Sequence, residues 1–144
     1  MKPGLSMEEL RALAARRFAA VGSGDIEATM ALLVDEPVFD LHPVGLRLEG
    51  QSAVRLYYAR FFAVCHGTLS AEPLATYFAD DAIVCELALT HQPPSGPREP
   101  YQLLAIMETE AGRFKGERLY GDERLFRIMF GDPIWPLLTP IASQ

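Results

Sequence analysis

The sequence lacks the features that define several large classes of protein. Its two cysteines, Cys65 and Cys85, are too few for the disulfide framework of a small secreted domain. No apolar run approaches the roughly 20 residues that a membrane-spanning helix needs, and residues 1–4 lack the apolar stretch of a secretory signal. We therefore expect a cytoplasmic protein with no membrane partner.

Basic residues are also scarce. The chain has 13 Lys and Arg against 19 Asp and Glu, which gives a formal net charge of −6. Because a negative surface repels phosphate backbones, we expect no nucleic-acid partner. Hydrophobic residues (49%) and charged residues (22%) occur in the proportions of an ordinary globular domain. The length of 144 residues predicts a single domain over 1–144, with a flexible N-terminus at 1–5 and a Pro-rich tail at 131–144.

The spacing of apolar residues predicts helices in the first half of the chain. Ser6 and Glu9 form a capping box, and an apolar stripe that includes Phe18 follows at intervals of three and four residues. Asp25 is placed to cap a second helix, which Pro37 would end. We expect helices at about 6–21, 26–34 and 51–64, with a short extended segment at 38–44.

Alternation of apolar and polar residues predicts strands in the second half. In the segment 83–91, the odd positions form an apolar face that ends at His91. Further strands are expected at 69–78, 101–109 and 114–120, and a last short helix after its N-cap, Asp122. Helices first and strands afterwards indicate an α+β fold with a mostly antiparallel sheet. A strongly curved sheet around the helices would enclose an apolar cavity.

Three stretches carry a resemblance to a known superfamily. The segment His42-Pro43-Val44-Gly45 resembles the D-P-V-G segment of ketosteroid isomerases, and Thr90-His91 with the Pro/Gly loop after it resembles the T-H-x-G stretch of SnoaL-like proteins. Residues 117–122 and the helix that ends at 131–133 resemble the closing strand and the C-terminal helix. The chain thus resembles the nuclear-transport-factor-2-like superfamily. The resemblance implies a cone-shaped, cystatin-like barrel, a pocket for a small apolar ligand, and a homodimer.

The catalytic positions of this superfamily hold other residues here. By the resemblance, the isomerases' general base falls on His42, and their oxyanion-hole tyrosine falls near Arg17 or Phe18. The remaining catalytic acids and the arginine of isomerases, cyclases and limonene epoxide hydrolases fall on apolar residues: Leu87, Leu89, Ala105 and Leu119. The resemblance therefore carries over the fold and the pocket, but none of these three mechanisms intact.

Four residues are our candidates for catalysis. Asp40 and His42 leave the same face of an extended segment, so that Asp40 would orient His42 as a general base if that face lines the cavity. Alternatively, Asp40 is a solvated turn residue and His42 a packed one. His91 would lie at the cavity mouth or bond to the Pro-rich loop after it. Tyr58 would donate to a carbonyl or serve as a core aromatic, and since Tyr57 points roughly 100° away, at most one of them would face the pocket.

The pocket wall is predicted from the inward faces of the same elements. Arg17 lies beside the apolar stripe of the first helix, where it would hold a substrate carboxylate or enolate, or else extend to the surface beside Arg16. Glu117 alternates with Leu119 and would face either inward or an exposed edge. We expect further substrate contacts from apolar side chains: Phe18, Phe61, Leu87, Leu89 and Leu119.

Two hypotheses of function follow. The first is a cofactor-independent isomerase, cyclase or dehydratase that moves a proton on an apolar carbonyl metabolite such as a polyketide, a terpenoid or a steroid-like compound. The second is a non-catalytic binding or dimeric assembly module of the same fold. The positions of the two histidines distinguish these hypotheses. If His42 and His91 face one cavity, the enzyme is favoured, and if they lie on opposite sides of the sheet, the binding module is favoured. No metal is predicted, because Asp40, His42 and His91 would form a ligand set only if they converged.

Overall fold

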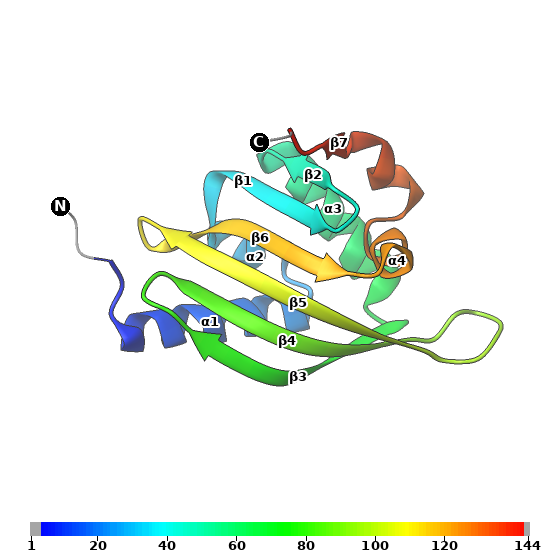
Figure 1. Cartoon of the computed structure of the whole chain (residues 1–144), viewed down its shortest axis with the longest axis horizontal. Helices are drawn as coiled ribbons and strands as arrows, with labels where there is room; N and C mark the ends of the chain where they lie inside the picture. The colour runs from blue at the N-terminus through cyan, green and yellow to red at the C-terminus, as the bar shows by residue number, and fades with distance from the viewer. Residues whose placement is uncertain (1–3, 143–144) are drawn as a thin grey trace.

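The computed structural model describes residues 4–142 and consists of four α-helices and one seven-stranded sheet (Figure 1). In the first half, the elements are α1 (Met7–Ser23), α2 (Ile26–Ala31), β1 (Leu33–His42), β2 (Leu46–Glu49) and α3 (Gln51–Cys65). In the second half, they are β3 (Leu69–Phe78), β4 (Ala82–His91), β5 (Glu99–Glu110), β6 (Arg113–Gly121), α4 (Glu123–Ile134), the 3₁₀ helix η1 (Trp135–Leu137) and β7 (Thr139–Pro140).

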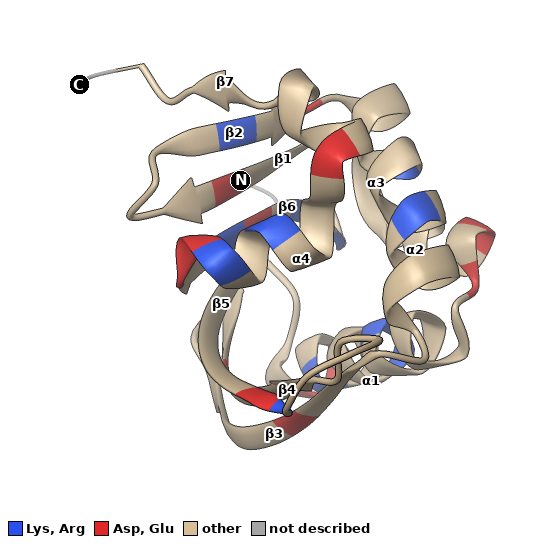
Figure 2. Cartoon of the chain, turned by 90° about the vertical axis from the view of Figure 1, so that its right-hand side faces the viewer, with Lys and Arg blue, Asp and Glu red and all other residues tan. Residues whose placement is uncertain are grey.

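The sheet has the strand order β3-β4-β5-β6-β1-β2-β7 and does not close. All neighbouring strands are antiparallel except β1 and β6, which run parallel. Seen from the end in Figure 2, the sheet is strongly curved and the helices lie on its concave side. The predicted α+β architecture, a curved and mostly antiparallel sheet around the N-terminal helices, is confirmed.

The first helix begins as the capping box predicts. The Ser6 hydroxyl accepts from the Glu9 amide, and the Glu9 carboxylate accepts from the Ser6 amide, each at 3.0 Å. The second helix is shorter than predicted, because it ends at Ala31 and β1 already begins at Leu33. Pro37 therefore lies inside a strand, where a register shift between Leu33 and Val38 leaves no regular ladder bond for its missing N–H. Within residues 4–142, no helix is long and apolar enough to cross a membrane.

The segment after Gly131 is more regular than the predicted extended or loose tail. The helix α4 continues through a kink at Gly131, where φ is 69°, and η1 follows it. The strand β7 then pairs with β2, a short strand that the sequence pattern did not reveal. Of the predicted flexible N-terminus at 1–5, residues 1–3 lie outside the described residues, as do residues 143–144 of the tail.

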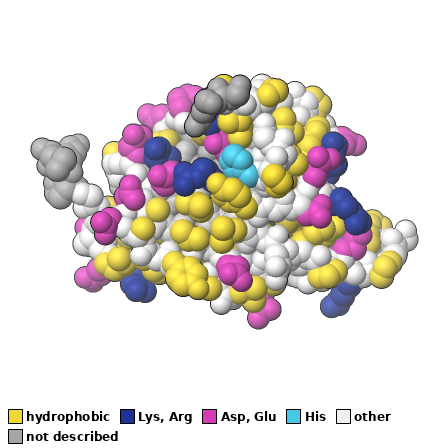
Figure 3. Space-filling view, viewed as in Figure 1, with side chains coloured by type: hydrophobic (Ala, Val, Ile, Leu, Met, Phe, Trp, Pro, Cys, Tyr) yellow, Lys and Arg dark blue, Asp and Glu magenta, His cyan; other side chains and the backbone are white. Residues whose placement is uncertain are grey.

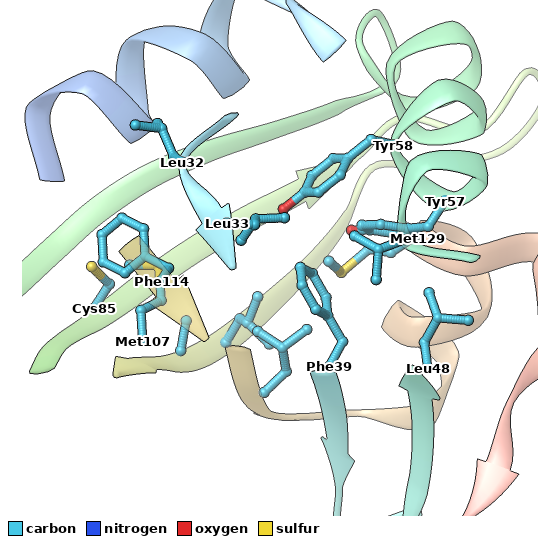
Figure 4. Close-up of a cluster of buried hydrophobic side chains, with 14 of the residues drawn as sticks. Leu32, Leu33, Phe39, Leu48, Tyr57, Tyr58, Cys85, Met107, Phe114 and Met129 are labelled. Carbon is cyan, nitrogen blue, oxygen red and sulfur yellow. The ribbon is translucent and has the colours of Figure 1, made fainter. Parts of the chain in front are cut away.

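The hydrophobic core fills the space between the helices and the concave face of the sheet. Phe39 of β1 is fully buried and meets the rings of Tyr57 and Tyr58 edge-on, with centroids 5.8 and 5.9 Å away. Figure 4 shows both tyrosines extending from α3 into this interior. On β1, Phe39 and Leu41 are the inward residues, so the alternate residues of this strand face away from the core.

Candidate functional site

A cavity of about 330 Å³ lies on the concave side of the sheet, between α1, α3 and the strands β3 to β6. Its volume is at the lower end of the roughly 300–1,000 Å³ typical of small-molecule sites. The structure brings to it every side chain that the sequence analysis placed in the pocket wall: Arg17, Phe18, Phe61, Leu87, Leu89, Glu117 and Leu119. Apart from Arg17 and Glu117, the lining residues are uncharged and mostly apolar.

The mouth of the cavity lies between α1 and the edge strand β3. Four lining residues are solvent-exposed, namely Phe18 and Gly22 of α1 and Ala71 and Pro73 of β3. The pairing of β3 with β4 shifts register between Pro73 and Ala75, so the strand is irregular beside the mouth. Phe18, which is 42% exposed, therefore forms part of the rim rather than of the buried stripe of α1.

Arg17, rather than Phe18, belongs to the buried stripe of α1. Its neighbours on the stripe are Leu13 and Ala14, four and three residues earlier, and all three residues are buried. The alternative that Arg17 extends to the surface beside Arg16 is wrong, because only 7% of the Arg17 side chain is exposed. The spacing of Arg17 from Leu13 and Ala14 was the sequence signal for its burial, although charged residues are usually exposed.

The Arg17 guanidinium is held by three side chains. Its Nε donates to the Met107 sulfur at 3.1 Å, and its Nη2 donates to the Tyr58 hydroxyl at 2.9 Å. The same Nη2 lies 2.9 Å from Oε2 of Glu117, whose side chain is 12% exposed. Nη1 is buried and, within the described residues, has no hydrogen-bond partner. The cavity wall therefore holds a buried ion pair that leaves one strong donor unused.

Burial and charge fix the protonation states in the cavity. Burial alone would lower the pKa of the Arg17 guanidinium, but Glu117 and Tyr58 raise it above its ordinary value, so Arg17 is a cation. Burial raises the pKa of the Tyr58 hydroxyl more than Arg17 lowers it. Burial likewise raises the pKa of Tyr57 and of the Cys85 thiol, which also line the cavity. Both tyrosines and the cysteine are therefore neutral near pH 7.

Glu117 reaches the cavity through a bulge in β6. Between Phe114 and Arg118, β6 has one residue more than the paired stretch of β5. Lys115 is exposed and Gly116 is the extra residue against Val38, so that Phe114 and Glu117 both reach the inner side although they are three residues apart. Gly116 has φ +136°, and a Cβ there would lie 1.8 Å from the Val38 carbonyl oxygen. Only glycine fits this position.

The structure places Asp40 and His42 on the outer face of the sheet, away from the cavity. They alternate with the buried Phe39 and Leu41, and this alternation was visible in the sequence. Asp40 does not orient His42, since its two oxygens accept from Arg47 at 2.6 and 2.9 Å. The His42 ring instead stacks on Tyr120 at 4.9 Å between centroids.

His91 lies on the cavity side of β4 but beyond the cavity itself. Its Nδ1 is 3.1 Å from Oε1 of Glu99, the first residue of β5, and this contact matches the structural alternative of a bond to the loop region. The predicted mouth near His91 is therefore not where the cavity opens. His42 and His91 lie on opposite faces of the sheet, and among residues 4–142 no three His, Cys, Asp or Glu side chains converge as a metal site.

Among the lining residues that the sequence analysis did not predict, three lie beside the ion pair or the tyrosine Tyr58: Tyr57, Cys85 and Met107. Tyr57 lines the cavity together with Tyr58, so the expectation that at most one of them faces it is wrong. Tyr57 is buried and stacks on Phe130 at 4.3 Å, because α3 presents a broad face to the interior. Cys85 and Met107 are the other two, and both occupy inward positions of strands whose alternation is evident in the sequence.

Solved structures with this fold differ widely in function. A protein from Jannaschia sp. CCS1 assigned as a SnoaL-like polyketide cyclase superposes with a TM-score of 0.69 at 16% identity, over 92% of this chain and 100% of that one. A designed protein with a curved β-sheet gives 0.66 at 16% identity, over 92% and 99%. An LEH-like epoxide hydrolase from M. tuberculosis gives 0.64 at 18% identity, over 85% and 87%. At these identities the likeness shows the fold alone.

The sequence itself carries a family match. Residues 14–116 match the SnoaL-like domain, and this stretch is more than half of the chain. It contains α1 from Ala14 onward, the mouth, the inward face of β4 and the Gly116 bulge, while Glu117 lies just beyond it. No curated protein sequence matches the chain. The protein is thus a member of the SnoaL-like domain family.

Proposed function

We propose that the chain binds a small apolar carbonyl compound in this cavity and catalyses a proton transfer on it, as an isomerase, cyclase or dehydratase without an organic cofactor. The observation that carries the proposal is the buried set of Arg17, Glu117 and Tyr58 in an otherwise apolar cavity. A few polar groups that converge in an apolar pocket are the usual pattern of a small-molecule site.

The cost of burying these charges supports a role in function. Desolvation of a buried ion pair can outweigh its attraction, and apolar residues of similar volume are often at least as stable. Neighbouring inward positions of the same sheet are occupied by buried apolar residues, Ala105 on β5 and Leu119 on β6. Arg17 and Glu117 therefore contribute little to the fold that leucine or methionine would not, and chemistry toward a ligand explains them better.

The proposed roles follow from the positions of the three side chains and from the protonation states of Arg17 and Tyr58. The Glu117 carboxylate accepts a proton from a carbon next to the ligand carbonyl and returns it to another atom of the ligand. Arg17 and the neutral Tyr58 hydroxyl stabilise the negative charge that develops on the carbonyl oxygen. Tyr58 accepts from Arg17, which leaves its own proton free to donate. Asp40, His42 and His91 take no part in this proposal, since they do not line the cavity.

Substitution of the base tests the proposal. Native mass spectrometry of the purified protein identifies a retained ligand, and turnover of that compound and its analogues is then measured with Glu117→Gln. Loss of a general base lowers turnover about 10²–10⁴-fold. His42→Ala is the matched control and is expected to stay within about threefold. A Glu117→Gln variant with turnover near that of the wild type would remove Glu117 from the mechanism.

A non-catalytic binding module is the second candidate. It is favoured by the positions of His42 and His91 on opposite faces of the sheet, and by the apolar residues Leu89, Ala105 and Leu119 where the superfamily has catalytic acids. Mass analysis of a bound compound after prolonged incubation separates the two candidates. A compound recovered unchanged, with every analogue equally inert, supports binding alone.

We also propose that the chain forms a homodimer through the outer face of the sheet. Figure 3 shows hydrophobic side chains gathered near the centre of this face, and the partly buried Val84 and Ala88 of β4 point toward it. Native mass spectrometry measures the subunit number directly. Val84→Glu is expected to give a monomer, and a wild-type protein that is monomeric at all concentrations would contradict the proposal.

A further inference from the structure

We infer that the polar group of the ligand is an uncharged hydrogen-bond acceptor that pairs with Nη1 of Arg17, and that the cavity discriminates against anionic ligands. This inference rests on the proposed binding function and goes beyond it, because it specifies the charge of the compound and the atom that recognises it. The class consists of compact, mainly hydrocarbon molecules with one carbonyl or ether oxygen.

The missing partner of Arg17 determines the kind of group. A guanidinium has five N–H donors and no acceptor. In this site Nε is engaged by Met107, and Nη2 is engaged by Tyr58 and Glu117, whereas Nη1 has no partner within residues 4–142. A buried donor without a partner is costly and uncommon in native proteins. Since Nη1 can only donate, the group that satisfies it must be an acceptor.

The charge balance of the cavity determines that the acceptor is neutral. Among the lining residues, Arg17 is the single cation and Glu117 the single carboxylate, and they lie 2.9 Å apart. The other titratable lining side chains, Tyr57, Tyr58 and Cys85, remain protonated because burial raises their pKa values. With Glu117 as the carboxylate that pairs with Arg17, the cavity has no net charge. A ligand carboxylate would add a second negative charge beside Glu117 with no cation to balance it.

Three fixed contacts give Arg17 a defined position. Met107, Tyr58 and Glu117 come from β5, α3 and β6, so three separate elements hold the guanidinium. Arg17 needs no ligand to become ordered, and little conformational entropy is lost when a ligand binds. The remaining walls are hydrocarbon, and they select for an apolar body around the single oxygen.

The test uses three probes with one bicyclic skeleton: 2-tetralone, tetralin and tetralin-2-carboxylate. Their dissociation constants are measured at pH 7 by isothermal titration calorimetry. For the wild type, we expect the ketone to bind at least about tenfold more tightly than either the hydrocarbon or the carboxylate, as for a hydrogen bond to a charged donor. A wild type that prefers the carboxylate overturns the inference and leaves the proposed pocket function standing.

Glu117→Gln sharpens the test because it leaves Arg17 as an unbalanced cation. We expect the carboxylate to gain at least about tenfold relative to the ketone in this variant. Asp40→Asn is the matched control, since it frees Arg47 from its carboxylate on the outer face, and the order of the three probes should not change. An unchanged order in Glu117→Gln contradicts the inference.

A double variant covers the case in which Glu117→Gln does not fold. Arg17→Met with Glu117→Met makes the wall apolar, and the ketone should then lose its advantage over tetralin. A double variant that still prefers the ketone would show that another group recognises the oxygen. Failure of all three probes to bind wild-type protein would overturn the proposed binding function together with this inference, and so distinguishes the two failures.

Discussion

Two arginine–carboxylate pairs lie on opposite faces of one sheet, and they are built differently. On the outer face, Arg47 donates from two nitrogens to both oxygens of Asp40, at 2.6 and 2.9 Å, with a third of its side chain exposed. On the inner face, Arg17 reaches one oxygen of Glu117 and is almost fully buried, and its Nη1 has no partner in the part of the chain that the structure describes. The outer pair is bidentate and a third of its arginine is exposed, although the two carboxylates are equally buried, with 12% of each side chain exposed. The inner pair has the more deeply buried arginine and is incomplete, as expected for groups that meet a ligand.

The largest expected difference between the two pairs is in stability. Arg17→Met leaves Glu117 as an unpaired charge in the cavity wall and should cost about 3–5 kcal/mol of unfolding free energy. Arg47→Met should cost less, about 1–2 kcal/mol, because a third of Arg47 is exposed and the outer groove that holds Asp40 also contains Lys115 and Arg118. Urea unfolding followed by circular dichroism measures both. The double variant Arg17→Met with Glu117→Leu should regain most of the lost unfolding free energy. Equal losses in Arg17→Met and Arg47→Met would contradict the proposed difference between the two pairs.

The bulge that turns Glu117 inward gives the next largest effect. Gly116→Ala forces a Cβ against the Val38 carbonyl at a positive φ, and we expect a loss of about 1–3 kcal/mol. Affinity for the ligand should fall as well, because Glu117 moves with the backbone. Gly67→Ala is the control, since a Cβ there meets nothing within 4 Å. An unaltered thermal midpoint and affinity in Gly116→Ala would mean that β6 tolerates the change by another route.

The buried tyrosines of the inner face predict a pH dependence. Burial raises the pKa of Tyr57 well above its ordinary value near 10. The folded state therefore holds this proton more tightly than the unfolded chain, so the contribution is fully present below about pH 10 and is lost as the pH rises further. In Tyr57→Phe, the fall of stability between about pH 10 and 11 should be smaller than in the wild type. Tyr77→Phe, at a position 62% exposed, should leave that fall unchanged.

The smallest effect is expected for the outer pair and its neighbour. Asp40→Asn and His42→Ala should leave ligand affinity within about twofold, because neither side chain lines the cavity. Calorimetric titration with the compound identified by mass spectrometry checks this. A tenfold loss of ligand affinity in either variant would show that side chains on the outer face affect binding in the cavity.

The fold was predictable where one local signal acted alone. The capping box at Ser6 and the alternation in 83–91 determine α1 and β4 without reference to the rest of the chain. The segment 26–34 was misassigned because Leu33 fits a helical stripe as well as a strand, and only its pairing with Phe114 of β6 decides between them. The short strand β2 depends on its hairpin with the adjacent β1 and on β7, which lies near the other end of the chain.

The site was predictable in its wall but not in its polar groups. The odd residues of β4 identified Leu87 and Leu89 because strand alternation has a fixed period. Asp40 and His42 were favoured as site residues for their chemistry. Because Phe39 and Leu41 are apolar and alternate with them, the strand pattern already indicated that Asp40 and His42 face outward. The bulge at Gly116 has no signal in a single sequence, because it arises from the approach of the Val38 carbonyl.

The irregular edge beside the mouth has a consequence for self-association. The strand β3 ends the sheet, and an open edge can recruit strands from other molecules. Pro73 has no N–H to offer, and the register shift that follows it breaks the regular row of backbone groups. The same few residues that admit a ligand therefore also make this edge a poor template for aggregation.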